Sequence, residues 1–282
     1  MIKPVLQNEA LIQQIDQEQN DQEELQVWWL GQSGYLIQYK SVRLLIDPYL
    51  SDTLTKKYAA TNKPHVRISE LVVEPSLLKN IQLLTASHFH TDHLDAATIL
   101  PIWEQNPLMK VLVPTALRQQ SAERLKVSEE ALICLRDGEA IDVNGIGVYG
   151  VPAKHNEIER DENGACKCMG YVFTIGSFTV YHSGDTLYYE ELPQLLKKFK
   201  IDLAFLPING NEPSRGVAGN LDGKEAVQLA LEAGFKHVIP GHYDLFAFNT
   251  VSTALFESTA TKARISFSIL PLGGYWNSRN FL

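Results

Sequence analysis

The residues most suited to chemistry lie in the segment 88–94, which reads His-Phe-His-Thr-Asp-His-Leu and directly follows an apolar run. In a strand-like conformation His88 and His90 point to the same side, whereas Asp92 and His93 approach from a different direction. One short segment can therefore supply ligands to two neighbouring divalent ions. The rest of the chain must supply the remaining ligands.

Three further candidate ligands, His155, Asp185 and His242, lie far apart in the sequence but share one context. Each follows an apolar, strand-like run after a short connection that contains glycine or proline. Gly184 and Gly241 would let the backbone approach a metal cluster without a clash from a Cβ atom. Loops of this kind can present all three side chains to one cleft.

Together the candidate ligands form a two-ion set. We expect His88, His90 and His155 to bind one ion, Asp92, His93 and His242 to bind the other, and Asp185 to bridge the two. Seven ligands leave each ion a position for water or substrate, which is typical of a catalytic site. Imidazole and carboxylate donors serve zinc, manganese and iron alike, so the donor types leave the metal open.

Composition narrows the class of protein. The chain has 282 residues, 45% of them hydrophobic, and a formal net charge of −8. This charge argues against a broad nucleic-acid or membrane-binding surface, and it favours a small-molecule substrate. The three cysteines cannot all pair within one chain, and such sparse use favours a reducing compartment. With no signal sequence and no apolar stretch of about 18 residues, we expect a cytoplasmic protein. A homo-oligomer is compatible with the sequence.

The hydrophobic pattern predicts an α/β protein. Residues 1–26 read as a helical appendage, with a surface helix at 8–24, and residues 27–282 as one domain. Residues 49–74 are irregular, and we expect them to border the site as a lid. Two mixed sheets packed face to face, with helices on both outer faces, accommodate the order of the remaining elements.

The remaining elements alternate between helix and strand, with hairpins in the middle of the chain. A capping box at Asp222 and Glu225 marks the start of one helix. Predicted helices cover residues 96–106, 116–125, 190–199, 222–233 and 251–260, and predicted strands include 111–113, 131–135, 201–206, 237–239 and 264–270.

The ordered motifs resemble those of the metallo-β-lactamase superfamily. The resemblance rests on Ser87-His-Phe-His-Thr-Asp-His93, the lone His155, the stretch 183–186 and Gly241-His242. Segments 206–210, 219–222 and 240–244 are similar to the L-ascorbate 6-phosphate lactonase branch. The resemblance implies an αββα four-layer sandwich and hydrolysis of a lactone ester with two manganese or zinc ions. The motif continues as Leu94-Asp95 where many members have glycine, which distances it from glyoxalase II and tRNA-processing nucleases.

We therefore expect a metal-dependent hydrolase that opens a lactone or similar ester of a sugar or small acid, L-ascorbate 6-phosphate among the candidates. A metal-bound hydroxide is the expected nucleophile, with Asp92 as the catalytic residue that orients it. Arg215, Asn209 and Tyr243 are the predicted substrate-binding residues, with Lys154 and Lys167 as rivals of Arg215 for a phosphate. Asp47 and Asp244 are predicted to accept the second N–H of ligating imidazoles.

Two other functions remain open from the residues. A metal-dependent phosphodiesterase or nuclease would use the same ions on phosphorus. A non-catalytic sensor would keep the ligands without turnover. The other histidines, His65, His182 and His237, are interpreted as structural, because an isolated histidine near a strand end is more often packed than ligating.

Overall fold

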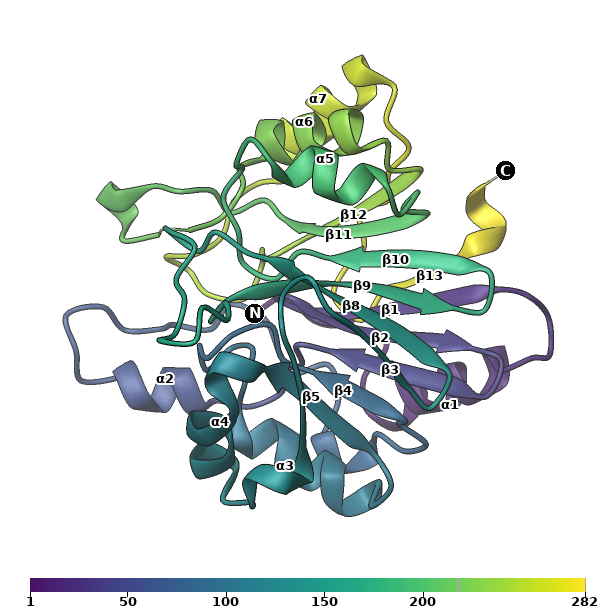
Figure 1. Ribbon diagram of the computed structural model, residues 1–282, viewed down its shortest axis with the longest axis vertical. Coiled ribbons are helices and arrows are strands. Elements are labelled where there is room, and N and C mark those ends of the chain that lie inside the picture. Colours follow the sequence, from purple (N-terminus) through teal and green to yellow (C-terminus); the bar gives the residue numbers. More distant parts are fainter. Residues whose placement is uncertain (218, 282) are drawn as a thin grey trace.

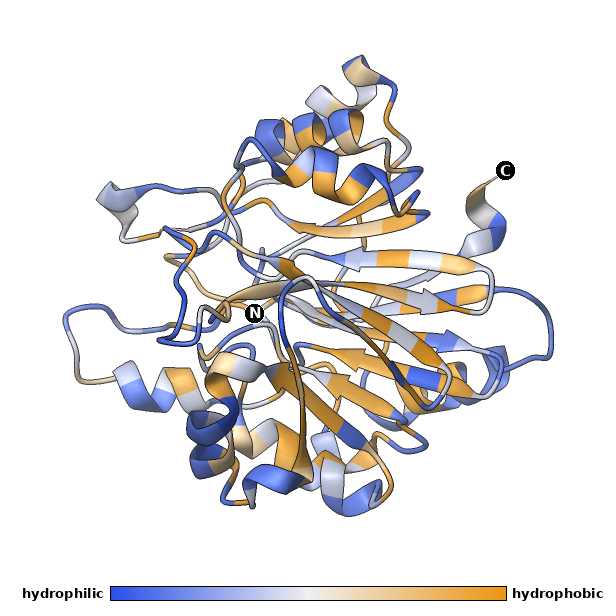
Figure 2. Ribbon diagram, viewed as in Figure 1, coloured by the Kyte–Doolittle hydropathy of each residue, from blue (hydrophilic) through white to orange (hydrophobic). Residues whose placement is uncertain are grey.

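The computed structural model describes residues 1–217 and 219–281, without the side chains of Arg215 and Asn280. Two β-sheets pack face to face, and helices cover the outer face of each sheet (Figure 1). This arrangement confirms the predicted αββα sandwich of two mixed sheets. The strands consist largely of hydrophobic residues, whereas the helices mix hydrophobic and hydrophilic residues, as the hydropathy colouring shows (Figure 2). This pattern suits sheets that share a core and helices with one face in solvent.

The first sheet has seven strands in the order β13-β1-β2-β3-β4-β5-β6. The strands β3 to β6 run parallel, and β13, β1, β2 and β3 run antiparallel. The strands are β1 (Leu25–Gly31), β2 (Gly34–Tyr39), β3 (Val42–Ile46), β4 (Leu83–Thr85), β5 (Lys110–Pro114), β6 (Leu132–Leu135) and β13 (Tyr275–Asn277).

The second sheet has six strands in the order β12-β11-β10-β9-β8-β7. The hairpins predicted for the middle of the chain turn at Asn144-Gly145 and Gly176-Ser177, and β10, β11 and β12 run parallel. The strands are β7 (Ala140–Val143), β8 (Ile146–Pro152), β9 (Met169–Ile175), β10 (Phe178–His182), β11 (Leu203–Pro207) and β12 (His237–Gly241).

Each parallel part of a sheet is connected through helices, as parallel strands require. In the view of Figure 1, α3 and α4 lie below the first sheet, and α5, α6 and α7 lie above the second. The helices are α1 (Glu9–Glu18), α2 (Thr53–Tyr58), α3 (Ala96–Gln105), α4 (Arg118–Leu125), α5 (Leu192–Lys197), α6 (Gly223–Ala233) and α7 (Ala254–Ala263). The Asp222 side chain caps α6 in the predicted capping box.

Aromatic side chains join the two sheets. Tyr35 of β2 stacks on Phe205 of β11 with ring centroids 4.0 Å apart, and both rings are buried. Such ring pairs hold the sheets in a fixed relation, which in turn fixes the loops that leave them. The helix α1 buries Leu11 and Ile15 completely in this same core. The division of the chain at residue 26 stays a prediction.

Two local predictions need correction. Residues 264–270 form no strand and make only one isolated bridge, from Phe267 to Val238, because the segment accompanies β12 for only two backbone hydrogen bonds. The edge strand β13 of the first sheet is absent from the predicted strands, because three residues are too few to produce a periodic signal. The predicted irregular segment 49–74 contains a short helix, α2.

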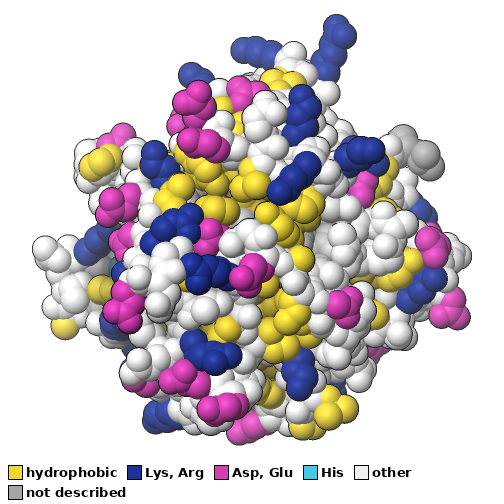
Figure 3. Space-filling model, in the orientation of Figure 1, with side chains coloured by type: hydrophobic (Ala, Val, Ile, Leu, Met, Phe, Trp, Pro, Cys, Tyr) yellow, Lys and Arg dark blue, Asp and Glu magenta, His cyan; other side chains and the backbone are white. Residues whose placement is uncertain are grey.

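The surface gives two further observations. Acidic and basic side chains are mixed across the face seen in Figure 3, without a dominant patch of either sign. Among the described helices, none is both long enough and apolar enough to cross a membrane.

Candidate metal centre

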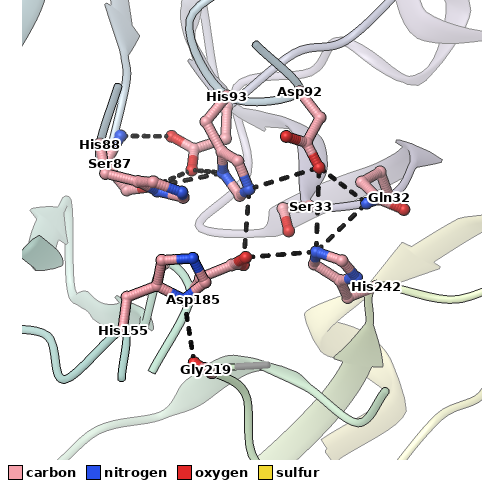
Figure 4. Close-up of polar contacts among 12 residues, drawn as sticks. Gln32, Ser33, Ser87, His88, Asp92, His93, His155, Asp185, Gly219 and His242 are labelled. Carbon is pink, nitrogen blue, oxygen red and sulfur yellow. Dashed lines mark hydrogen bonds and ion pairs between the residues drawn. The ribbon is translucent and has the colours of Figure 1, made fainter. Parts of the chain in front are cut away.

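The predicted ligands meet where four connections leave the ends of strands. The segment after β4 carries residues 88–95, and the connections after β8, β10 and β12 carry His155, Asp185 and His242. Figure 4 shows six of the predicted ligands pointing toward one another around the Asp185 carboxylate, and His90 lies with His88 and His155. All seven predicted ligands thus come together, although the two sheets contribute them from opposite halves of the chain.

His88, His90 and His155 form the first group, here called the imidazole group. Each offers one ring nitrogen, and the three nitrogens lie within 4.8 Å of one another. His88 is buried, and its Nε2 has no hydrogen-bond partner among the described residues. Burial, followed by the neighbouring His93 and His90, lowers the pKa of His88 well below its usual value. A buried neutral imidazole with an unused lone pair fits a metal ion.

A single backbone contact orients His155. The carbonyl oxygen of Gly219 lies 3.1 Å from Nδ1, which leaves Nε2 for an ion. Gly219 has a φ of +82°, and a Cβ atom at this position would lie 2.1 Å from His155 Nδ1. Only glycine therefore permits this close approach.

Asp92, His93 and His242 form the second group, here called the carboxylate group. Their three ligand atoms also lie within 4.8 Å of one another. The Oδ2 atom of Asp92 is 3.8 Å from His93 Nε2 and 3.9 Å from His242 Nε2. These separations leave space between the atoms for a cation.

Asp185 connects the two groups. Its Oδ1 lies 3.4 Å from His93 Nε2, and its Oδ2 lies 3.3 Å from His242 Nε2. Asp185 also forms a possible ligand set with His88 and His93. Burial alone would raise the pKa of Asp185, but His242 and His93 lower it well below its usual range. The carboxylate is therefore ionised and available to two ions.

Asp47 supports the carboxylate group, as predicted for a hydrogen-bond partner of a ligand. Its Oδ2 lies 2.6 Å from His93 Nδ1, and its Oδ1 accepts a 2.9 Å bond from the Ser87 amide. The Ser87 hydroxyl also donates to Asp47. All three residues are buried. Such a carboxylate fixes the ring so that His93 Nε2 faces the centre.

The donor set fits divalent transition ions. It contains five imidazoles and two carboxylates and no thiolate, which suits zinc, manganese or iron. Because the ligands are preformed and mostly buried, and because His88 carries an unused nitrogen, these residues could hold metal without a rearrangement of the backbone.

A cavity of about 590 Å³ opens over the two groups. Asp92, Asp185 and His242 line its floor. Its walls come from α2 and the following segment, from α4, from Gly216, Val217 and Asn220, and from the segment that carries Phe246, Phe248 and Asn249. Lining residues in these walls include Lys57, Tyr58, Lys63, His65, Phe89, Arg124, Phe246, Phe248 and Asn249. The predicted lid segment therefore does border the site.

The predicted substrate-binding residues lie in several places. The ring of Tyr243 packs at a tilt against Trp29, and its hydroxyl donates to the Leu270 carbonyl at 2.8 Å, so the hydroxyl is engaged in the core. Asn209 is buried and donates to Asn249 Oδ1 at 2.8 Å, so it reaches the cavity through that residue. The backbone of Arg215 lies in a short 3-10 helix, and its side chain is outside the described residues.

The described residues show no hydrogen bond between Asp244 and the ligating imidazoles that were expected to be its partners. Its backbone amide bonds to the Thr250 hydroxyl at 2.8 Å, and burial raises the pKa of its side chain. The three histidines interpreted as structural lie outside both ligand groups. His182 is bonded between the Ser33 carbonyl and the Gly184 amide, and His237 lies between two serine hydroxyls.

Two residues at the site escaped the sequence analysis. Gln32 is buried in the turn between β1 and β2, and its Nε2 lies 2.9 Å from Asp92 Oδ2. A glutamine in a turn between two glycines carries no metal signature in the sequence. Arg124 of α4 donates to the carbonyls of Phe89 and Leu94, and so holds both ends of the histidine segment.

A two-sheet sandwich with helices outside and a histidine and aspartate centre at its strand ends defines the class of metallo-β-lactamase-fold proteins. The comparison with protein families agrees with this class. Residues 42–243 match the beta-lactamase superfamily domain. The chain belongs to this family.

Sequence relatives support the same family. A UPF0173 metal-dependent hydrolase from Saccharolobus solfataricus is 28% identical over 221 residues, which cover 78% of this chain and 84% of the relative. A second UPF0173 metal-dependent hydrolase, from Methanosphaerula palustris, is 26% identical over 257 residues, which cover 89% of this chain and 98% of the relative.

Solved structures share the fold at lower identity. The isothiocyanate hydrolase from Delia radicum gut bacteria superposes with a TM-score of 0.70 at 19% identity, and covers 89% of this chain and 98% of its own. The metallo hydrolase Igni18 from Ignicoccus hospitalis has a TM-score of 0.65 at 18% identity, and covers 90% and 98%. At these identities the likeness concerns the fold alone.

Proposed function

We propose that this protein is a metal-dependent hydrolase that opens a lactone or similar ester of a sugar or small acid. The observation that carries the proposal is the convergence of seven ligands from four strand ends beneath an open cavity. Two sequence relatives that align with this chain over most of their length are named metal-dependent hydrolases, which supports the reaction class.

The residues of the chain have separate roles in this reaction. Bound divalent ions supply Lewis acidity and an activated water at neutral pH. Asp92 lines the cavity, so its carboxylate can orient a nucleophile toward the substrate. His155 and His242 line the same cavity and would hold one ion each next to the reacting bond.

The walls of the cavity support a small anionic substrate. Lys57, Lys63 and Arg124 line it, and among the described residues none of them forms an ion pair with a carboxylate. Each lies over an aromatic ring, with Lys63 Nζ 4.5 Å from the centroid of Phe248, and Lys63 and Arg124 also donate to backbone carbonyls. Cations without a carboxylate partner can receive a substrate phosphate or carboxylate. L-ascorbate 6-phosphate is therefore a candidate to test.

The reaction class is tested by replacing Asp92 with alanine in protein reconstituted with manganese or zinc. Because Asp92 belongs to the carboxylate group, we expect D92A to lose one bound ion and to lower lactone turnover by about 100-fold or more. The matched control is D21A, which removes an exposed carboxylate that does not line the cavity. Unchanged turnover by D92A would remove the proposed mechanism. Hydrolysis of a bis-aryl phosphate without any lactone hydrolysis would favour a phosphodiesterase.

Recognition of a phosphate is tested separately with phosphorylated and plain lactones. We expect K63M to raise KM about tenfold for the phosphorylated lactone and to leave the plain lactone nearly unchanged, as the loss of a charge-assisted bond predicts. K197M, on the exposed side of α5, is the control. R215A tests the predicted phosphate anchor in the same assay. An equal effect of K63M on both lactones would reject Lys63 as the anchor.

A further inference from the structure

Gln32 lies against the carboxylate group although glutamine is absent from the predicted ligand set. The side chain is fully buried, and its Nε2 lies 2.9 Å from Asp92 Oδ2 and 3.1 Å from His242 Nε2. Figure 4 shows the amide beside these two side chains. Its Oε1 is also buried and has no hydrogen-bond partner among the described residues. A buried amide oxygen without a partner needs an explanation.

A half-turn about the last side-chain bond exchanges the two ends of the amide. After this turn, Oε1 would occupy about the present position of Nε2, close to Asp92 Oδ2 and His242 Nε2. Neighbouring ligands of an octahedral ion with bonds of about 2.1 Å are about 3.0 Å apart. The separations of 2.9 and 3.1 Å therefore match those between adjacent ligands of one ion.

The backbone holds Gln32 in place for such a role. Its φ is +52°, and its carbonyl accepts a bond from Trp29 Nε1 at 3.0 Å and from the His242 amide at 2.9 Å. The second bond joins the turn directly to a residue of the carboxylate group. Because two hydrogen bonds hold the backbone of Gln32, its side chain stays beside the carboxylate group.

We propose that Gln32 is a further ligand of the ion bound by the carboxylate group, through its Oε1. In the metal-free protein the amide N–H group donates to Asp92 Oδ2 and faces the His242 Nε2 lone pair. When the ion takes these lone pairs, the amide turns and places its oxygen on the same ion. The added oxygen donor favours a harder ion such as manganese over zinc at this position. This inference rests on the proposed metal centre and makes its composition more specific.

The alternative role for Gln32 is that of a permanent N–H donor that only positions Asp92. Two substitutions separate the roles. Gln32→Met removes both the oxygen and the N–H group with little change in length. Gln32→Glu keeps an oxygen but replaces the donor with a negative charge, which would bind an ion and would repel Asp92 if no ion were bound there.

The experiment is calorimetric titration of chelator-stripped protein with manganese chloride or zinc chloride. We expect two ions in the wild type, and in Q32M an affinity about tenfold weaker for one ion only. In Q32E that ion should bind at least as tightly as in the wild type. The control is Ser33→Ala in the same turn, which should bind both ions normally. If Q32M does not fold, Gln32→Asn withdraws the same oxygen by one methylene and should weaken the same ion.

Two results would overturn the proposal. The first is a Q32E variant that binds the ion as weakly as Q32M or more weakly, since a donor role predicts this. The second is a Q32M variant that binds both ions with wild-type affinity. If the wild type bound no ion at all, the proposed function would fail together with this inference. If the wild type bound two ions and turned over normally, either overturning result would refute the Gln32 inference and leave the proposed function intact.

Discussion

The imidazole group and the carboxylate group use neighbouring residues of one segment but differ in their surroundings. In the imidazole group His88 is buried, His155 is half-buried and His90 is exposed, whereas His93 and His242 of the carboxylate group are buried. A second cavity of about 340 Å³, lined by Cys168 among others, also reaches the imidazole group. Asp92 of the carboxylate group is half-buried, and it lines the larger cavity together with His242. The imidazole group is thus the more exposed of the two, and we expect the ion bound there to exchange more readily.

The two groups also differ in charge. The imidazole group offers neutral donors, while the carboxylate group contains Asp92 and is backed by Asp47. Anionic donors attract a divalent ion more strongly than neutral donors, especially where water is excluded. We therefore expect the carboxylate group to bind the tighter ion and the imidazole group the weaker one.

The largest effect should come from Asp185, which is the ligand shared by both groups. Replacing it with asparagine removes the central negative charge, so both ions should bind more weakly. We expect turnover to fall more than the roughly 10- to 100-fold that is typical for a residue that only supports a ligand. Metal analysis of the purified D185N variant and its turnover are the measurements. Normal content of both ions would show that the groups are independent.

A smaller and one-sided effect is expected from Asp47→Asn. The variant retains a hydrogen-bonding side chain but loses the charge that orients His93. The tighter ion should lose roughly 10- to 100-fold in affinity, whereas the weaker ion should change little. Calorimetric titration of the metal-free variant measures both affinities. An equal loss for both ions would contradict the separation of the two groups.

The complementary change is Gly219→Ala, which acts on the imidazole group. Its Cβ atom would clash with His155, so the ring must move away from its ligand position. We expect the weaker ion to lose about tenfold in affinity, as for other residues that orient a ligand. Gly145→Ala, also at positive φ but with nothing near its Cβ position, is the control for backbone strain. If G219A weakened only the tighter ion, the assignment of His155 would be wrong.

These contrasts also show which residues of the site can be predicted from the sequence. The ligands were predictable because each lies just after an apolar strand, and Asp47 was predictable for the same reason. Gln32 was not, because a glutamine is compatible with any hairpin turn and only the tertiary fold brings it to Asp92. Tyr243 directly follows a ligand in sequence, but its ring packs on Trp29 and its hydroxyl points into the core.

The fold was predicted well where the pattern was periodic and long. Both sheets and the outer helices follow from alternating strands and helices, whereas β13 has only three residues and gives no pattern. Residues 264–270 look like a strand because they are apolar at alternate positions. In the structure their alternate serines bond to His237 while the backbone forms one bridge.

The smallest effect concerns His237, which lies on β12, the strand that precedes His242, but belongs to neither ligand group. A change at His237 therefore tests the stability of this strand without removing a metal ligand. Burial lowers the pKa of His237 to about 4 from an ordinary value of 6.5. The unfolded chain thus binds more protons between these values, so stability is lost as the pH falls from about 6.5 toward 4. The slope is at most about 1.4 kcal/mol per pH unit. Urea unfolding of the metal-free wild type and of H237Q at several pH values measures this loss of stability. An identical pH dependence of the two proteins would contradict the assignment of the loss to His237.

The central claim is that hydrolysis depends on the two-ion centre. The most direct measurement is turnover of phosphorylated and plain lactones by chelator-stripped protein as manganese or zinc is added in steps. We expect no turnover in the metal-free protein, and turnover that reaches its maximum as the second, weaker site fills. Full turnover without metal, or no turnover of any ester with both sites filled, would contradict the account.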